Sequence, residues 1–183
     1  MTIQYNGCFA IKLTQWIKSR EINFNIPEDI FKNIYKKNFN HSIEHTKRRF
    51  IKEFNKSFDD CYIIENVEPI ASGSIGQVYE AIEKETKKHV AIKVKHPNLM
   101  FNFYYNWFII SSILKIIHLF NVNIVLDVLN FTDLQSFKDD FLLQLNFKNE
   151  ASNQNQFYNL YENNNLIVIP KPLEYSDSFI ISE

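Results

Sequence analysis

Apolar side chains recur at helical spacing through the first third of the chain. They predict one helix over residues 9–16, a second over about 27–38 and a third over 43–54. Pro27, followed by two acidic residues, suits the start of the second helix, and Ser42 can cap the third. The N-terminal region is therefore expected to be helical.

After Cys61 the apolar period changes from helical to two. Three segments rich in β-branched and aromatic residues, 62–64, 77–82 and 89–95, predict strands. The connection over residues 70–76 contains two of the chain's three glycines. Polar residues 83–88 form the next turn.

Beyond Pro97 the helical pattern returns. It predicts a helix over about 102–120 and a long helix over about 131–161, and two short apolar runs, 167–169 and 179–181, predict closing strands. The expected class is α+β, a protein-kinase-like N-lobe whose small antiparallel sheet has about five strands. We expect a helical extension over residues 1–58 and the lobe over 59–183.

Composition narrows the classes of function. The 183 residues are 45% hydrophobic and carry a net charge of -1, which favours one globular domain without a field that attracts nucleic acid. Cys8 and Cys61 lack the paired spacing of a zinc or redox site. The apolar stretch 107–120 contains Lys115 and His118 and is shorter than the roughly 20 residues that span a bilayer.

The connection over residues 70–76 is the first candidate for chemistry. Gly73 and Gly76 lack side chains, so the backbone amides of residues 72–77 can approach anionic oxygens closely. A simple hairpin with a glycine turn is the alternative, because short glycine motifs are weak signals. The candidate nucleotide-binding residues are Ala71, Ser72, Gly73, Ser74, Ile75, Gly76, Gln77, Val78, Ala91 and Lys93.

The strand over residues 89–95 strengthens the nucleotide hypothesis. Its period of two places Ala91, Lys93 and Lys95 on one face, with a small residue for a flat base and an ammonium for phosphate. Lys93 needs an acid on a helix as its partner, yet no Asp or Glu lies between Glu85 and Asp127. Glu150 is the best candidate, which predicts an inserted helix before the pairing helix.

Three segments carry a resemblance to a known family. Residues 69–79 are similar to the alanine-rich loop, and residues 90–97 to the lysine strand, of the UbiB/ADCK atypical kinases. Residues 150–153, Glu-Ala-Ser-Asn, resemble the E-A-x-N helix of that family, which also has the inserted helix. The resemblance extends from about Phe9 to Glu183 and implies ATP as the cofactor. Gly73 stands where the family has alanine, so no preference between ATP and ADP is carried over.

A further segment resembles the K-x-G-Q signature of the same family, whose helix lies across the nucleotide site. Lys12 and Gln15 match that signature, while Thr14 replaces its glycine. The family's acidic partner, E-x-D, corresponds to Gln144 and Asn146, where both carboxylates have become amides. The resemblance implies a regulatory contact without charge assistance or help in metal binding. We predict no metal site.

The resemblance implies a role in isoprenoid-quinone (ubiquinone) biosynthesis or lipid homeostasis, with membrane or lipid contact through helical regions. Mitochondrial, plastid or bacterial membranes are the implied locations, but the first residues show no targeting pattern and leave the compartment open. No catalytic-loop aspartate or D-F-G element is recognised before Glu183. The segment is therefore not expected to transfer phosphate alone, and Mg²⁺ is expected only with a C-terminal lobe. A pseudokinase, an interaction module or a truncated gene product is the alternative.

One motif belongs to a different class. Residues 41–45 match H-x-x-E-H, a metalloprotease pattern in which Glu44 would act as general base. The acid-free stretch 86–126 makes a further acidic ligand hard to supply, and a cap at Ser42 leaves His41 outside the helix. We favour a polar helix start.

Overall fold

A computed structural model describes residues 7–19, 40–120 and 131–183. The chain divides into two compact units, one formed by residues 1–38 and 98–145 and the other by 39–97 and 146–183. We call them the helical unit and the sheet unit. The helix predicted over residues 27–38 lies outside the described residues.

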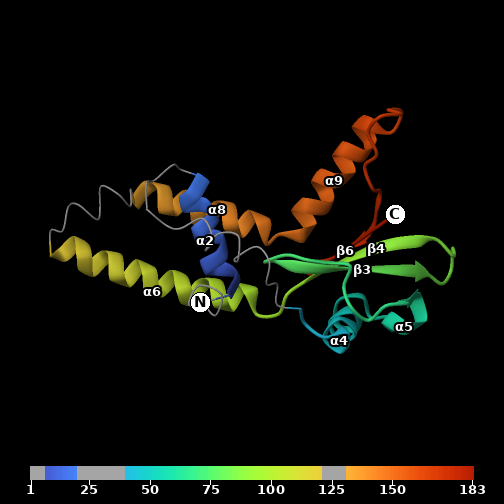
Figure 1. The fold of residues 1–183 in the computed structure, drawn as a ribbon, viewed down its shortest axis with the longest axis horizontal. Coiled ribbons are helices and arrows are strands. Elements are labelled where there is room, and N and C mark those ends of the chain that lie inside the picture. Colours follow the sequence, from blue (N-terminus) through green and yellow to red (C-terminus); the bar gives the residue numbers. More distant parts are fainter. Residues whose placement is uncertain (1–6, 20–39, 121–130) are drawn as a thin grey trace. The chain divides into compact units, whose positions relative to one another are not determined.

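Three described helices make up the helical unit, namely α2 (Gly7–Ser19), α6 (Leu99–Leu119) and α8 (Phe131–Gln144) (Figure 1). Aromatic rings form the centre of their packing. The Phe9 ring lies 5.5 Å from Phe103 and 5.6 Å from Phe137, and Phe103 stacks on Phe141 at 4.7 Å. The predicted helices over residues 9–16 and 102–120 are confirmed.

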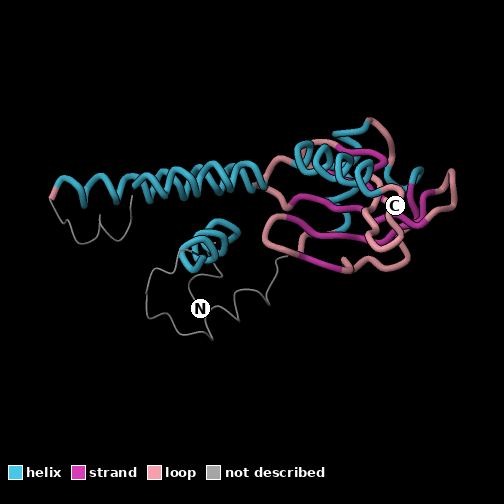
Figure 2. The backbone as a smooth tube through the Cα atoms, turned by 90° about the horizontal axis from the view of Figure 1, so that it is seen from above, coloured by secondary structure: helices cyan, strands magenta, loops and turns pink. Residues whose placement is uncertain are grey.

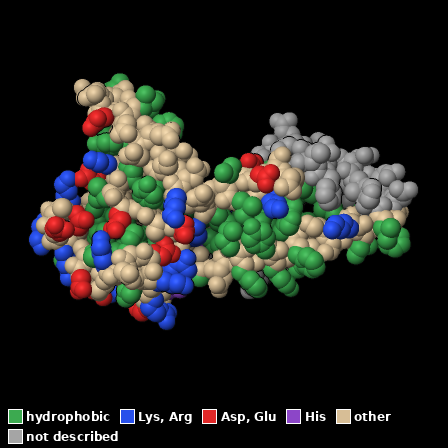
Figure 3. Space-filling model, turned by 180° about the vertical axis from the view of Figure 1, so that it is seen from behind, with side chains coloured by type: hydrophobic (Ala, Val, Ile, Leu, Met, Phe, Trp, Pro, Cys, Tyr) green, Lys and Arg blue, Asp and Glu red, His purple; other side chains and the backbone are tan. Residues whose placement is uncertain are grey.

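Helix α6 buries only part of its apolar surface, and hydrophobic side chains gather over the helical unit (Figure 3). The exposed ones on α6 include Phe101, Tyr104, Tyr105, Phe108, Ile113, Ile116 and Leu119. Among the described residues, none of the helices combines the length and hydropathy that a bilayer crossing requires.

An antiparallel sheet forms the second unit, with its strands running side by side (Figure 2). The strands are β1 (Tyr62–Ile63), β2 (Ala71–Ser72), β3 (Gly76–Glu83), β4 (His89–Lys95), β5 (Pro172–Tyr175) and β6 (Phe179–Ser182). Their order is β1-β3-β4-β6-β5, and β2 also pairs with β3. The register places Gly76 opposite Lys95, and Lys93 opposite both Val78 and Ile180.

Helices cover both faces of this sheet (Figure 1). On one face, α4 (Ile43–Phe54) and α5 (Phe58–Cys61) share a core with the inward residues of β3, β4 and β6. On the other face, α9 (Phe147–Tyr161) packs Phe147 and Ala151 against Ile180. The alternation of side chains along the strands separates an apolar face from the face that carries Lys93.

The two units differ from the expected division into an extension and a lobe at residue 58. Helix α4 lies before that boundary, yet Ile43 and Phe50 belong to the core of the sheet. Residues 39–58 therefore group with the sheet unit. Residues 98–145, predicted as part of the lobe, group instead with the N-terminal helix, because their apolar side chains pack with those of α2.

The single long helix predicted over residues 131–161 is wrong. The structure has α8 ending at Gln144 and α9 beginning at Phe147. Asn146 between them has an extended backbone, and its side chain accepts a hydrogen bond from Asn149 N at 3.0 Å. This N-cap begins a new helix, and the continuous apolar pattern hid the break.

The strand predicted over residues 167–169 is also wrong. Leu166 and Val168 are 94% and 89% exposed, whereas the strand beside β6 is formed by residues 172–175. A short apolar run becomes a strand only where it meets a free sheet edge, and β5 occupies the edge of β6. The short elements α5 and β2 escaped prediction, because two to four residues carry no measurable period.

Phe50→Ala tests whether α4 is integral to the sheet unit. Phe50 is fully buried and its ring contacts those of Phe54, Phe58, Tyr62 and Phe179. We expect the substitution to lower the free energy of unfolding by about 3–5 kcal/mol in urea titrations. Ile51→Ala, at a neighbouring position that is 50% exposed, is the control and should cost no more than about 1 kcal/mol. Equal effects would show that α4 does not share the sheet's core.

Candidate functional site

The hairpin between β2 and β3 forms a tight loop over residues 73–76. Gly73 N donates to Gly76 O at 2.8 Å, and Ile70 N donates to Val78 O at 2.9 Å. The side chain of Ile75, at the tip of the loop, packs against the small cluster of Phe147, Ala151 and Ile180. The loop therefore rests on the same face of the sheet as α9.

The two glycines of this loop have different constraints. A Cβ atom on Gly76 would lie 2.5 Å from the Val94 carbonyl oxygen, which is closer than Cβ atoms approach other atoms in proteins. A Cβ atom on Gly73 would meet its nearest neighbour, Gly76 O, at 3.8 Å, which is an ordinary contact. Gly76 is therefore required by the β3–β4 packing, whereas Gly73 is not required by packing in this conformation.

Lys93 and Glu150 form an ion pair on the face of the sheet that the loop shares. Lys93 Nζ donates to Glu150 Oε1, and it also lies 4.8 Å from the centre of the Phe147 ring. Glu150 belongs to the first turn of α9, whose start Asn146 determines. The side chains are 34% and 43% exposed, so the pair remains open to a ligand.

Lys95 reaches the same ring from the next position along that face. Its Nζ lies 4.8 Å from the Phe147 centroid and donates to the backbone oxygen of Asp177. Burial lowers the pKa of Lys95. Lys148 on α9 pairs with the Asp177 carboxylate at 3.0 Å. Sequence analysis placed Lys95 on this face but missed Phe147, which carries no motif of its own.

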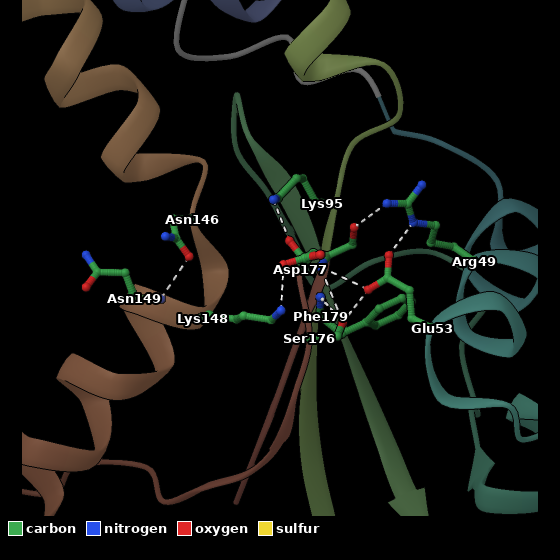
Figure 4. A network of polar contacts seen from close by, with 10 residues as sticks. Arg49, Glu53, Lys95, Asn146, Lys148, Asn149, Ser176, Asp177 and Phe179 are labelled. Carbon is green, nitrogen blue, oxygen red and sulfur yellow. Dashed lines mark hydrogen bonds and ion pairs between the residues drawn. The ribbon is translucent and has the colours of Figure 1, made fainter.

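The turn over residues 176–178 is held from the opposite side as well (Figure 4). Glu53 on α4 accepts hydrogen bonds from Ser176 Oγ and from Ser178 N, and Arg49 Nη2 donates to Ser178 Oγ at 2.8 Å. Burial alone would raise the pKa of Glu53, but the bonds from the two serines and Arg49 outweigh it and lower the pKa. The turn between β5 and β6 is thus fastened to both helices.

The remaining predicted nucleotide residues divide between the two faces. Val78, Ala91 and Lys93 share the face of α9, because Val78 and Lys93 are opposite each other. Gln77 points to the other face: it is buried and bonds to the backbone of His41. The contact predicted for Gln77 was by its backbone amide, so the direction of its side chain leaves that prediction as it was. Ser72 Oγ is buried and has no hydrogen-bond partner in the described part of the chain.

The K-x-G-Q-like residues lie in the helical unit. Lys12, Gln15 and Gln144 line a hollow of about 260 Å³, together with Trp16, Phe137, Asp140 and Phe141. Asp140, one helical turn before Gln144, contributes a carboxylate that the sequence analysis did not consider. Thr14 Oγ1 donates to Ala10 O at 2.7 Å, so its hydroxyl is satisfied within the helix. Asn146, the fourth predicted member, caps α9 in the sheet unit.

The H-x-x-E-H motif starts as expected, with Ser42 as the N-cap of α4 and His41 before the helix. Within the described ranges, no group of three or more His, Cys, Asp or Glu side chains has a metal-binding arrangement.

The antiparallel sheet, its glycine hairpin and the helix that pairs Glu150 with Lys93 define the sheet unit as a protein-kinase-like small lobe. Residues 15–182 match the model of the ABC1 atypical kinase-like domain. The chain therefore belongs to the ABC1 atypical kinase-like family.

Two relatives illustrate the membership. "Probable serine/threonine-protein kinase abkC" of Dictyostelium discoideum is 32% identical over 175 residues, which cover 94% of this chain and 25% of that protein. "Protein ACTIVITY OF BC1 COMPLEX KINASE 3, chloroplastic" of Arabidopsis thaliana is 29% identical over 119 residues, covering 65% and 16%. The chain spans a quarter or less of the length of these two relatives.

A solved structure shares the fold. Rv3197 of Mycobacterium tuberculosis, determined in complex with erythromycin, aligns with a TM-score of 0.53 and 20% identity over 76% of this chain and 34% of that one. Together with the family match, this likeness confirms the expected α+β, kinase-like fold with its small antiparallel sheet.

The two glycines allow a matched test of the loop. Gly76→Ala should lower the free energy of unfolding by about 1–3 kcal/mol, because the new methyl group forces β3 and β4 apart at Val94. Gly73→Ala should leave it unchanged or raise it by up to about 1 kcal/mol, since the position has space and alanine restricts the unfolded chain. Urea titration of both variants measures the difference, and a larger loss in Gly73→Ala would contradict the loop geometry.

Proposed function

We propose that the sheet unit binds an adenine nucleotide, with ATP as the ligand. The observation that carries the proposal is the Lys93–Glu150 pair, which lies on the same face of the sheet as the glycine loop. Lys93 contacts phosphate oxygens as an ammonium donor, and Glu150 holds Lys93 in position. This is the arrangement by which kinase folds place a lysine on the nucleotide phosphates.

The small contribution of the Lys93–Glu150 pair to stability favours a role in ligand binding. An exposed or half-exposed ion pair contributes only about 0–1 kcal/mol to stability. Both side chains are more than one third exposed, so the pair adds little to folding. A lysine held by a charge partner and an aromatic ring loses less conformational freedom when it binds an anion.

The other groups on this face have complementary roles. Val78 and Ala91 provide an apolar surface for a flat base, and the loop amides that are not bonded within the hairpin approach the phosphates. The amide of Gly73 is already bonded to Gly76 O, so it serves the loop rather than the ligand. A C-terminal lobe of the kind that kinase folds use would supply the protein oxygen ligands for a Mg²⁺ ion bound with the nucleotide.

For the whole protein we propose an atypical kinase or ATPase that acts in isoprenoid-quinone metabolism or lipid homeostasis. Family membership and the names of the two relatives support this activity. Lys12, Gln15 and Gln144, with Asp140 beside them, form a candidate regulatory site. The exposed apolar side chains of α6 are candidates for lipid contact.

A pseudokinase or interaction module is the second candidate. The observation that favours it is the presence of amides, Gln144 and Asn146, where the resemblance to the family implies carboxylates, which weakens any electrostatic or metal-binding role of that segment. Nucleotide binding separates this candidate from the first, because an interaction module has no need for a phosphate contact at Lys93.

Lys93→Ala is the direct test. We expect the affinity for a fluorescent ATP analogue to fall at least about tenfold, because a charge-assisted contact to phosphate is lost. Lys88→Ala is the control: this lysine lies in the β3–β4 turn and pairs with Glu183 outside the proposed site. Saturable binding by the parent and by Lys88→Ala but not by Lys93→Ala supports the assignment. Equal binding by all three proteins refutes it.

Glu150→Gln separates orientation of Lys93 from stability. The amide keeps the size of the side chain but removes its charge, so we expect nucleotide affinity to fall about three- to tenfold. The free energy of unfolding should change by less than about 1 kcal/mol, because the pair is half exposed. A stability loss several times larger, with affinity unchanged, would mean that the pair is purely structural.

A further inference from the structure

A row of three hydrogen bonds connects α4 to the glycine loop, separate from the Lys93–Glu150 pair. Thr46 Oγ1 lies 3.0 Å from His41 Nε2, and His41 Nδ1 lies 3.0 Å from His96 Nδ1. His96 Nε2 then lies 2.9 Å from the carbonyl oxygen of Gly73. These contacts join residues from before α4, within α4, after β4 and in the loop.

Hydrogen-bond chemistry allows one order of protons along this row when both rings are neutral. The Gly73 carbonyl only accepts, so His96 Nε2 carries a proton and His96 Nδ1 has a lone pair. His41 Nδ1 must therefore donate to His96, which leaves His41 Nε2 to accept from the hydroxyl of Thr46. His96 is therefore protonated at Nε2, and His41 is protonated at Nδ1.

The surroundings favour the neutral rings. Burial, with further contributions from His96 and His45, lowers the pKa of His41 to about 4. Burial also lowers the pKa of His96, although the bond to Gly73 opposes this shift, and His45 lowers it further. His45 itself faces Arg48 and Arg49, and burial and these cations lower its pKa.

His96 holds the loop by two bonds, one from the ring and one from the backbone. Its ring donates to Gly73 O, and its backbone N donates to Ile75 O at 2.8 Å. In a planar trans peptide the N–H points opposite to the C=O. The N–H groups of Ser74 and Gly76 are therefore turned away from His96.

We propose that His96 is a positioning residue that, held in one tautomer by His41, orients the Ser74 and Gly76 amides toward the phosphates of a bound nucleotide. The proposal rests on the proposed nucleotide function of this loop. This role accounts for the hydrogen bond from His96 Nε2 to the Gly73 carbonyl, which could otherwise bond to water.

The proposal has a pH dependence with a definite sign. Protonation of His96 adds a second N–H that faces the N–H of His41, so the row breaks and the loop loses its ring contact. The pKa values of both rings lie below the ordinary value of 6.5, so the row is intact at neutral pH and is lost as the pH falls through the lowered pKa of His96. The unfolded chain takes up these protons from about pH 6.5 downward, which also lowers the stability of the fold over that range.

Two variants at His96 test the positioning role through binding of a fluorescent ATP analogue to the full chain. His96→Leu removes the donor to Gly73 and should weaken binding about three- to tenfold at pH 7.5, the effect of one net hydrogen bond. His96→Gln can donate through its amide without titrating, and it should bind within about twofold of the parent. His89→Gln, at an exposed histidine that contacts Glu80, is the matched control and should bind like the parent.

The pH profile separates positioning from packing. Between pH 7.5 and 4.5, with folding verified by circular dichroism, the parent should lose about threefold more affinity than His96→Gln. Titration of the ligand phosphates affects both proteins equally and cancels in this ratio. Identical profiles, or parental affinity in His96→Leu, overturn the proposal, and so does a His96→Gln protein that binds as weakly as His96→Leu.

A measurement without nucleotide keeps the two proposals distinct. Nitrogen-15 NMR of the histidine rings should show His96 protonated at Nε2 and His41 at Nδ1, and hydrogen exchange at residues 73–76 should be faster in His96→Leu than in the parent. Absence of nucleotide binding by the parent refutes the proposed function. If the two rings show the opposite tautomers, or if hydrogen exchange at residues 73–76 is unchanged in His96→Leu, the positioning role of His96 is refuted even if nucleotide binds.

Discussion

Gly76 lies against the Val94 carbonyl at a distance that leaves no room for a side chain, and this close approach sets the pairing of β3 with β4. The register places Lys95 opposite Gly76 and Lys93 opposite Val78. It also places His96 beside the loop, where it reaches two carbonyl groups. The position of the Lys93 charge and the contacts that shape the loop therefore depend on one backbone constraint.

The two faces of the sheet carry different kinds of residue. The apolar face packs aromatic side chains of α4 and α5 and supplies most of the stability, since burial of large apolar groups is the dominant favourable term. The other face keeps two lysines over one aromatic ring and leaves the Lys93–Glu150 pair half exposed. The residues that stabilise the fold and those of the proposed ligand contact thus lie on opposite faces of the same strands.

The two faces are linked where β5 turns into β6. Glu53 and Arg49 hold the turn from α4, while Lys95 and Lys148 hold Asp177 from the other side. The glycine loop is linked to α4 in a similar way, through His41 and His96. Movement of α4 would therefore displace both the β5–β6 turn and the glycine loop, although α4 contributes no residue to the Lys93–Glu150 pair.

Much of the candidate site followed from local signals. A period of two predicted β3 and β4 and the shared face of Ala91 and Lys93, and the absence of nearer acids pointed to Glu150, which the structure places against Lys93. The role of this pair in nucleotide binding stays a prediction. Alternation along β3 also places the side chain of Gln77 on the opposite face from that of Val78, and the contact predicted for the Gln77 backbone amide stays a prediction.

The sequence by itself determined the class of fold, the family and the residues that carry charge on the glycine-loop face, because periodicity and short motifs are properties of neighbouring residues. Only the tertiary structure decided the break at Asn146, the strand at residues 172–175, the fastening of the turn at Asp177 and the row from Thr46 to Gly73. Most of these features join residues many positions apart, and their meeting depends on strand register and on competition for a free sheet edge. A pattern read along one segment contains neither.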